Sequence, residues 1–188
     1  TTRAVRKINA ADRIQALPEF SGIQLQTQLS APWLAMLDVR SQQGLAVSFE
    51  DDAYLGWYVW GNHDRVERPT FEWFFKDLPA GHWHTTEFDL IQVDDLAGLV
   101  FASPDLLADC DYVVEAGRVR FRTHLRPLAD LGPSVLRTRL RQVGGIWEHS
   151  VPDRTYGSLA GESNAVHRFD VVFPGEGVYE MTQTLAAG

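Results

Sequence analysis

The feature that most constrains the fold of this chain is an alternation of apolar and polar residues that recurs along most of its length. Successive side chains of a β-strand point to opposite faces, so such alternation places one set in a core and the other toward solvent. Strands of this kind, separated by turn signals such as Pro174-Gly175-Glu176-Gly177, predict an all-β fold, namely an antiparallel β-sandwich. Clear examples are residues 23–29 (IQLQTQL), 44–50 (GLAVSFE), 118–125 (RVRFRTHL) and 136–142 (LRTRLRQ).

Helical signals are confined to two short segments. Residues 9–17 (NAADRIQAL) have Asn9 in a capping position and Pro18 directly after their end. Residues 103–110 (SPDLLADC) begin with a serine cap and carry proline at the first helical position. A parallel α/β fold needs a helix after nearly every strand, so the sequence predicts a sandwich with one or two short helices.

Composition changes near residues 95–115, which bears on domain organisation. Residues 1–95 form an aromatic-rich half and residues 96–188 an Arg-rich half. At 188 residues the chain is long enough for one large domain or two small ones. We predict one continuous β-sandwich unit over residues 1–188, with a division into these two halves as the alternative.

Charge and motif content disfavour several function classes. The formal net charge is −8, whereas nucleic-acid binding needs a basic surface that replaces counterions. No apolar run approaches the roughly 20 residues of a membrane-spanning helix. The single cysteine, Cys110, lies between Asp109 and Asp111, whose charges disfavour a reactive thiolate. We therefore predict no nucleic-acid partner, no membrane span and, in the absence of any phosphate-loop or dinucleotide motif, no cofactor.

Four of the six tryptophans fall within 27 residues, at Trp57, Trp60, Trp73 and Trp83. Aromatic residues at this density either fill a sheet core or form a stacking surface for a flat ligand. An exposed indole beside hydrogen-bonding side chains suits a sugar ring, because the C–H face stacks on the indole while the hydroxyls pair with polar groups. The predicted ligand-binding set is Trp57, Tyr58, Trp60 and Trp73 for stacking, with Asn62, Asp64, Arg68 and Glu72 for polar contacts.

A metal site is the alternative for the same region. The blocks Gly61-Asn62-His63-Asp64 and Gly81-His82-Trp83-His84 resemble the GNH[DE] and GHxH blocks of calcineurin-like metallophosphoesterases. The DxH and GDxxD blocks that this family also uses do not occur before Gly61, so the resemblance covers eight residues only. A simpler site for one divalent ion would use His63, Asp64, His82 and His84.

An arginine stripe is the third candidate. Residues 118–141 carry seven Arg and one acid, whereas residues 85–115 carry eight acids and no Lys or Arg. If the two Arg-rich strands pair with each other, the arginines line one face of adjacent strands, where like charges destabilise a sheet unless something offsets them. The offset would come from the acidic segment or from an anionic partner. The predicted anion or partner face is Arg120, Arg122, Arg137, Arg139 and Arg141.

These observations lead to one expectation and two alternatives. We expect a non-catalytic carbohydrate-binding or accessory module of a larger carbohydrate-active or cell-surface protein, with a saccharide or a partner domain as its partner. The alternatives are a metal-dependent hydrolase or lyase that uses the His/Asp cluster, and an assembly domain that docks through the Arg-rich sheet face. Because sandwiches host many unrelated functions, the site residues have to decide between them.

Overall fold

The computed structural model describes the backbone of residues 2–8, 22–25, 32–38, 41–49, 54–62, 65–75, 79–96, 98–115 and 117–187. Side chains are described for residues 32–35, 37, 41–49, 79–96, 98–115 and 117–187. Every regular element in these ranges is a β-strand, and all strand pairs are antiparallel. The predicted all-β fold is therefore confirmed.

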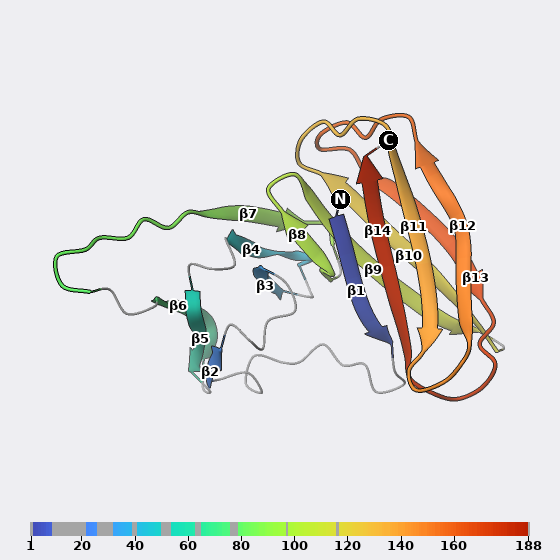
Figure 1. Ribbon diagram of the computed structural model, residues 1–188, viewed down its shortest axis with the longest axis horizontal. Helices are drawn as coiled ribbons and strands as arrows, with labels where there is room; N and C mark the ends of the chain where they lie inside the picture. The colour runs from blue at the N-terminus through green and yellow to red at the C-terminus, as the bar shows by residue number, and fades with distance from the viewer. Residues whose placement is uncertain are drawn as a thin grey trace.

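The strands form four sheets (Figure 1). Sheet A contains, in order, β1 (Thr2–Ile8), β14 (Tyr179–Ala187), β11 (Ser134–Gln142) and β12 (Glu148–Tyr156). Sheet D contains β13 (Ala165–Val171), β10 (Arg118–Pro127), β9 (Leu106–Glu115) and β8 (Phe101–Ser103). Sheet B contains β2 (Gly22–Leu25), β5 (Tyr54–Asn62) and β6 (Arg65–Phe75), and sheet C contains β3 (Trp33–Asp38), β4 (Gln43–Phe49) and β7 (Phe88–Asp94).

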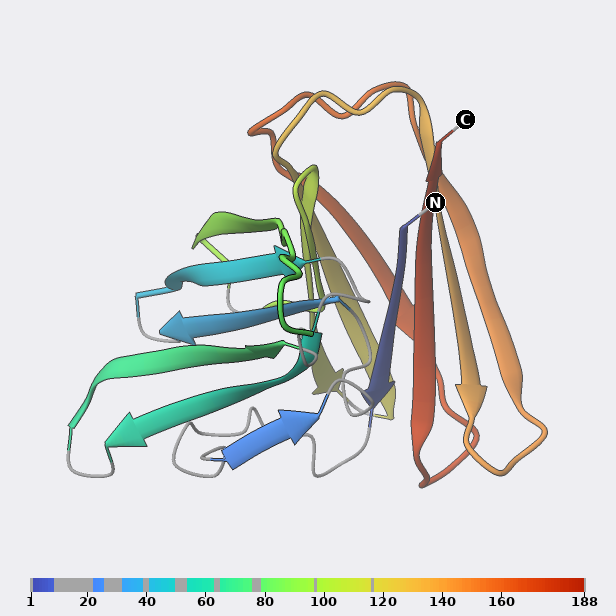
Figure 2. The same cartoon turned by 60° about the vertical axis from the view of Figure 1, so that its left-hand side comes forward.

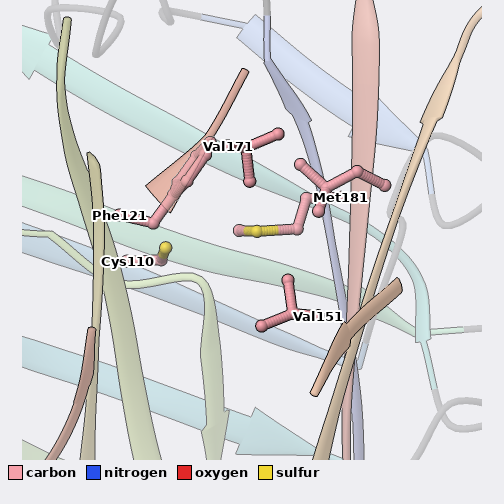
Figure 3. Packing of buried hydrophobic residues seen from close by; sticks show 6 residues of the cluster. Cys110, Phe121, Val151, Val171 and Met181 are labelled. Carbon is pink, nitrogen blue, oxygen red and sulfur yellow. The ribbon is translucent and has the colours of Figure 1, made fainter. Parts of the chain in front are cut away.

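Sheets A and D pack face to face as a sandwich. The alternation that defines the strands produces this core, because Phe121 and Leu125 of β10 and Leu136 and Leu140 of β11 are all buried. Figure 3 shows Phe121 and Cys110 of sheet D approaching Met181 of sheet A. Burial of such side chains stabilises the fold by about 1.5–3 kcal/mol each, before the entropy cost of ordering them.

Three polar side chains occupy the centre of this sandwich. Gln183 of β14 donates from Nε2 to Oγ1 of Thr123 at 2.8 Å and to Oγ1 of Thr138 at 3.1 Å. All three residues are buried, and their hydrogen bonds join sheet D to sheet A. Because the three side chains form hydrogen bonds with one another, their burial avoids the free-energy cost of leaving a buried polar group without a hydrogen bond.

Sheet C covers one part of the outer face of sheet D. Ala46, Ile91 and Val93 of sheet C pack with Ala102 and Leu107 of sheet D in one buried cluster. Figures 1 and 2 show sheets B and C together on one side of the sandwich. The aromatic-rich segment thus projects from the sandwich, and it is placed there by the packing of sheet C.

The expected helical turn at residues 103–110 is wrong. Ser103 ends β8 and Leu106 begins β9, so Pro104 and Asp105 form the turn of a tight hairpin. Serine followed by proline suits the start of a β-turn as well as the start of a helix, and the pairing of β8 with β9 decides between them. The other expected helix, residues 9–17, lies outside the described residues.

Within the described ranges, no helix is long and apolar enough to cross a membrane.

Candidate functional site

The hairpin of β5 and β6 brings the predicted stacking residues to facing positions. Its register pairs Trp57 with Trp73 and Tyr58 with Glu72. Directly paired residues of an antiparallel ladder share one face of the sheet. The tryptophans 57 and 73 therefore belong to one face of sheet B, and Tyr58 with Glu72 to the other.

The remaining members of the predicted ligand set lie around the same hairpin. Trp60 pairs with Thr70, Asn62 pairs with Arg65 at the end of β5, and Arg68 is a residue of β6. Asp64 lies outside the described residues, and the side chains of this hairpin are not among those described. The backbone register gathers these residues on one hairpin but divides them between its two faces, and the roles of their side chains stay a prediction.

The described indole that faces solvent in the aromatic-rich segment is Trp83, which the predicted ligand set omitted. Its side chain is 84% exposed, and His82 and His84 beside it are exposed as well. Residues 79–87 form no strand, and Figure 1 shows them as part of the long green loop that precedes β7. The sequence signal for this loop is Pro79-Ala80-Gly81, where Gly81 adopts a φ of 80° and the His82 amide donates to the Pro79 carbonyl at 3.1 Å.

A hollow of about 610 Å³ opens where this loop joins β7. The part of its wall that the structure describes combines two carboxylates, two hydroxyls and two aromatic rings. Its lining residues are Ser48, Phe49, Thr86, Glu87, Phe88, Asp89 and Pro104. The pairing of β4 with β7 fixes most of this wall, because Phe49 is opposite Phe88 and Ser48 is opposite Asp89.

The chemistry of this hollow suits a polyhydroxylated ligand. Carboxylates accept hydrogen bonds from ligand hydroxyls, and the hydroxyls of Ser48 and Thr86 can either donate or accept. Phe88 is 46% exposed, so part of its ring can contact a ligand. Because the described lining carries two acids and no base, it favours neutral or cationic ligands over anionic ones.

The predicted metal set is only partly described. His82 and His84 lie two residues apart on the exposed loop and not on a strand. His63 and Asp64 lie outside the described residues. Among the described side chains, no group of three or more His, Cys, Asp or Glu is arranged to hold a metal ion. The His/Asp metal site stays a sequence prediction.

The two Arg-rich strands do not pair with each other, so the condition for a single arginine face is not met. β10 lies between β9 and β13 in sheet D, whereas β11 lies between β12 and β14 in sheet A. Their apolar faces meet across the sandwich, so their arginines point outward on opposite sides of it. The reason is that alternation specifies which face of a strand is buried but does not specify which strand lies beside it.

Most arginines of the predicted partner face have acidic partners within the fold. On sheet D, Arg122 forms a bidentate ion pair with Asp111, with a shortest contact of 2.6 Å, and Arg120 lies 3.5 Å from Glu115. The side-chain hydrogen bond to Asp111 is the main cause that raises the pKa of Arg122. Asp111 and Glu115 of the acidic segment offset these arginines, as one of the two sequence hypotheses expected. Asp170 of β13, outside that segment, contributes as well, since it pairs with Arg118 and Arg120 at 3.4 Å.

Sheet A differs in one position. Arg137 pairs with Asp153 at 3.3 Å and Arg141 with Glu180 at 2.8 Å. Arg139, between them, has no ion pair with a described carboxylate. A single exposed arginine between two ion pairs is an ordinary feature of a sheet surface. The five arginines therefore do not form one anion-binding face.

A group of exposed apolar side chains lies in or next to three hairpin turns at one end of the sandwich. The turns are β9–β10, β11–β12 and β13–β14, which Figure 1 shows at its lower right. The amide of Val143 donates to the carbonyl of Val178 at 2.9 Å, and this hydrogen bond joins two of the turns. The exposed residues are Val113, Val114, Val143, Ile146, Val172 and Val178.

Comparison with known proteins finds no family model, no curated protein and no solved structure that matches this chain.

Proposed function

We propose that this chain is a non-catalytic saccharide-binding module, with its site on the loop of Trp83 and the adjoining hollow at the start of β7. The observation that carries the proposal is the 84% exposure of the Trp83 indole. Trp83 precedes Thr86 of the hollow by three residues, so their Cα atoms are at most about 11 Å apart. One bound oligosaccharide is long enough to contact both.

The expected contacts follow from the chemistry of a sugar. The apolar face of a pyranose ring stacks on the indole of Trp83, while its hydroxyls donate to the carboxylates of Glu87 and Asp89. Since the hollow is acidic, the ligand is a neutral or amino sugar, and uronates or sulfated sugars bind more weakly. The hairpin of β5 and β6, with Trp57 opposite Trp73, is the proposed extension of this surface.

Isothermal titration against neutral, amino and acidic polysaccharides tests this proposal. A ligand in the neutral or amino class should bind, and Trp83→Ala should raise its Kd about tenfold, because a stacked aromatic ring contributes about 1–2 kcal/mol. The matched control is Ile146→Ala, which truncates a fully exposed apolar side chain on a hairpin turn of the sandwich and should leave Kd unchanged.

A second variant tests the charge of the hollow. Asp89→Asn keeps the shape of the side chain and removes one negative charge. It should therefore weaken the binding of neutral sugars and reduce the difference in affinity between neutral and acidic sugars. Absence of binding to all three polysaccharide classes would overturn the proposal. Equal Kd values for wild type, Trp83→Ala and Asp89→Asn would show that the saccharide binds at another site.

A further inference from the structure

A β-bulge in β12 reverses the faces of that strand. The register pairs Val151 with Thr138, but the next pair is Arg154 with Leu136, so residues 152 and 153 stand opposite a single residue of β11. Because Leu136 is buried in the sandwich core, Arg154 lies on the inward side of sheet A. Bulges commonly re-aim side chains in this way next to functional sites.

The bulge brings Tyr156 to the seam between the two sheets. β12 is the edge strand of sheet A, and β13 is the edge strand of sheet D. Tyr156 of β12 and Ala165 of β13 pack against the same buried cluster, so both edge strands border one end of the sandwich core. His167 follows Ala165 by two residues and pairs with the buried Thr123, which places it on the same inward side.

Two buried polar atoms lie at this seam without a hydrogen bond of full geometry to any described residue, and Arg154 lies beside them. The phenol oxygen of Tyr156 and Nε2 of His167 are buried without a hydrogen-bond partner. The guanidinium carbon of Arg154 lies 5.6 Å from the centroid of the Tyr156 ring, and Arg154 forms no ion pair with a described carboxylate. Buried polar groups of native proteins are nearly always paired, so two unpaired atoms that both lie near Arg154 call for an explanation.

The three groups share one chemical requirement. A guanidinium can only donate hydrogen bonds, a protonated phenol can donate one, and a neutral imidazole with its proton on Nε2 can donate one. Burial is the main cause that raises the pKa of Tyr156, whereas the charge of Arg154 and the close polar approach of its guanidinium to the phenol act in the opposite direction. Burial followed by the charge of Arg154 lowers the pKa of His167. The phenol is therefore protonated and the imidazole neutral at neutral pH, which leaves the charge of Arg154 as the positive charge of the seam.

We propose that the seam between β12 and β13 binds a small oxyanion through Arg154, Tyr156 and His167. An oxyanion has several acceptor atoms and a negative charge, which matches three donors and one cation. Arg154 is the exposed member of the group, so the anion first contacts its guanidinium. Movement of that side chain off the Tyr156 ring then opens the phenol and the imidazole to the anion.

The test uses the full chain and three probes, namely inorganic phosphate, sulfate and acetate, each at constant ionic strength with chloride as the balancing anion. The imidazole nitrogen resonances of His167 are followed by NMR, and Kd is measured by calorimetry. At least one probe should cause a saturable shift of these resonances and raise the pKa of His167, since a bound anion favours the imidazolium. The ranking of the three probes separates tetrahedral from carboxylate ligands.

Two variants and one matched control complete the test. Arg154→Gln should weaken binding by at least tenfold, and Tyr156→Phe, which keeps the ring in the core, should weaken it by a smaller factor. The control is Arg168→Gln, because Arg168 is an exposed arginine of β13 that pairs with the outward Arg122 and should leave Kd unchanged.

Absence of saturable binding for all three probes would overturn the proposal, as would equal affinity in wild type and in both Arg154→Gln and Tyr156→Phe. The result is independent of the saccharide site, because Trp83→Ala should leave the oxyanion affinity unchanged.

Discussion

Gly98 approaches the carboxylate of Asp109 so closely that the position excludes any side chain. The Gly98 amide donates to Oδ2 of Asp109 at 3.2 Å, and the Cys110 amide donates to Oδ1 at 2.7 Å. A Cβ atom at Gly98 would lie 2.9 Å from Oδ1 of Asp109, which is itself only 4% exposed. These contacts hold the chain that leads from sheet C into sheet D.

Gly98→Ala should therefore lower the free energy of unfolding by about 1–3 kcal/mol, because the carboxylate has to shift within a packed environment. Urea unfolding measures the change. The matched control is Gly132→Ala, where an added Cβ meets nothing within 4 Å and the change should be neutral or slightly stabilising. Equal stability of the two variants would show that the contact at Asp109 is relaxed in solution.

His167 makes a second prediction at the residue scale. Its pKa is lowered in the folded protein by burial and by Arg154, whereas an unfolded histidine titrates near about 6.5. The unfolded state therefore takes up the proton first as the pH falls, and stability present above pH of about 6.5 is lost as the pH drops toward the folded pKa. Unfolding free energies at pH 7.5 and 5.0, measured in a chloride buffer without oxyanions, should show this loss.

The matched comparison is between His167→Gln and His149→Gln. The first should reduce the pH dependence of stability, and the second should leave it as in wild type, because His149 is exposed. If the free energy of unfolding of His167→Gln changed with pH as much as that of the wild type, the pH dependence would come from other groups.

At the scale of elements, the polar centre of the sandwich connects three strands through one side chain. Gln183 of β14 donates to the hydroxyls of Thr123 in β10 and Thr138 in β11. Gln183→Leu removes both hydrogen bonds and should lower the free energy of unfolding by about 2 kcal/mol, because the two hydroxyls stay buried. The triple variant with Thr123→Val and Thr138→Val should recover most of this loss, since no polar group is then left unpaired. Urea unfolding of both variants measures the recovery, and a triple variant less stable than the single one would contradict it.

Alternation predicts the buried face of these strands correctly but not their neighbours. Phe121 and Leu140 are buried as their periodicity predicts, yet β10 and β11 belong to different sheets. The connecting chain between them crosses the sandwich, and its length and composition suit a hairpin equally well. Sheet membership follows from long-range pairing, which no local pattern in the sequence contains.

The bulge in β12 shows a second limit of local patterns. Residues 148–156 (EHSVPDRTY) lack a clean alternation, and the inward side of Arg154 follows from the extra residue at the bulge. An arginine in a polar segment is expected to be exposed, as Arg154 is, but the side of the strand on which it lies depends on the bulge. The sequence therefore contains the residues of the seam without indicating that they meet.

At the scale of the whole molecule, the described large apolar side chains that stay exposed form two groups. One lies on the hairpin turns at the end of the sandwich, and the other, which includes Trp83, Phe88 and Leu90, lies in the aromatic-rich part. The density of aromatic residues predicts the second region, but not which indole faces solvent. The spacing of His82 and His84 suggests a strand around Trp83, whereas the turn at Pro79 and Gly81 places this indole on a loop.

The central claim is that the aromatic-rich part binds a saccharide while the sandwich provides the scaffold. NMR of the indole N–H groups tests it most directly, because the chain has six tryptophans and each gives its own resonance. On titration with a neutral or amino oligosaccharide, the Trp83 resonance, assigned with Trp83→Phe, should shift in a saturable manner. Trp147, which packs against Phe173 and Tyr179 in the sandwich, should not shift. The account would be contradicted if the Trp83 resonance did not shift with any saccharide class, or if only the Trp147 resonance shifted.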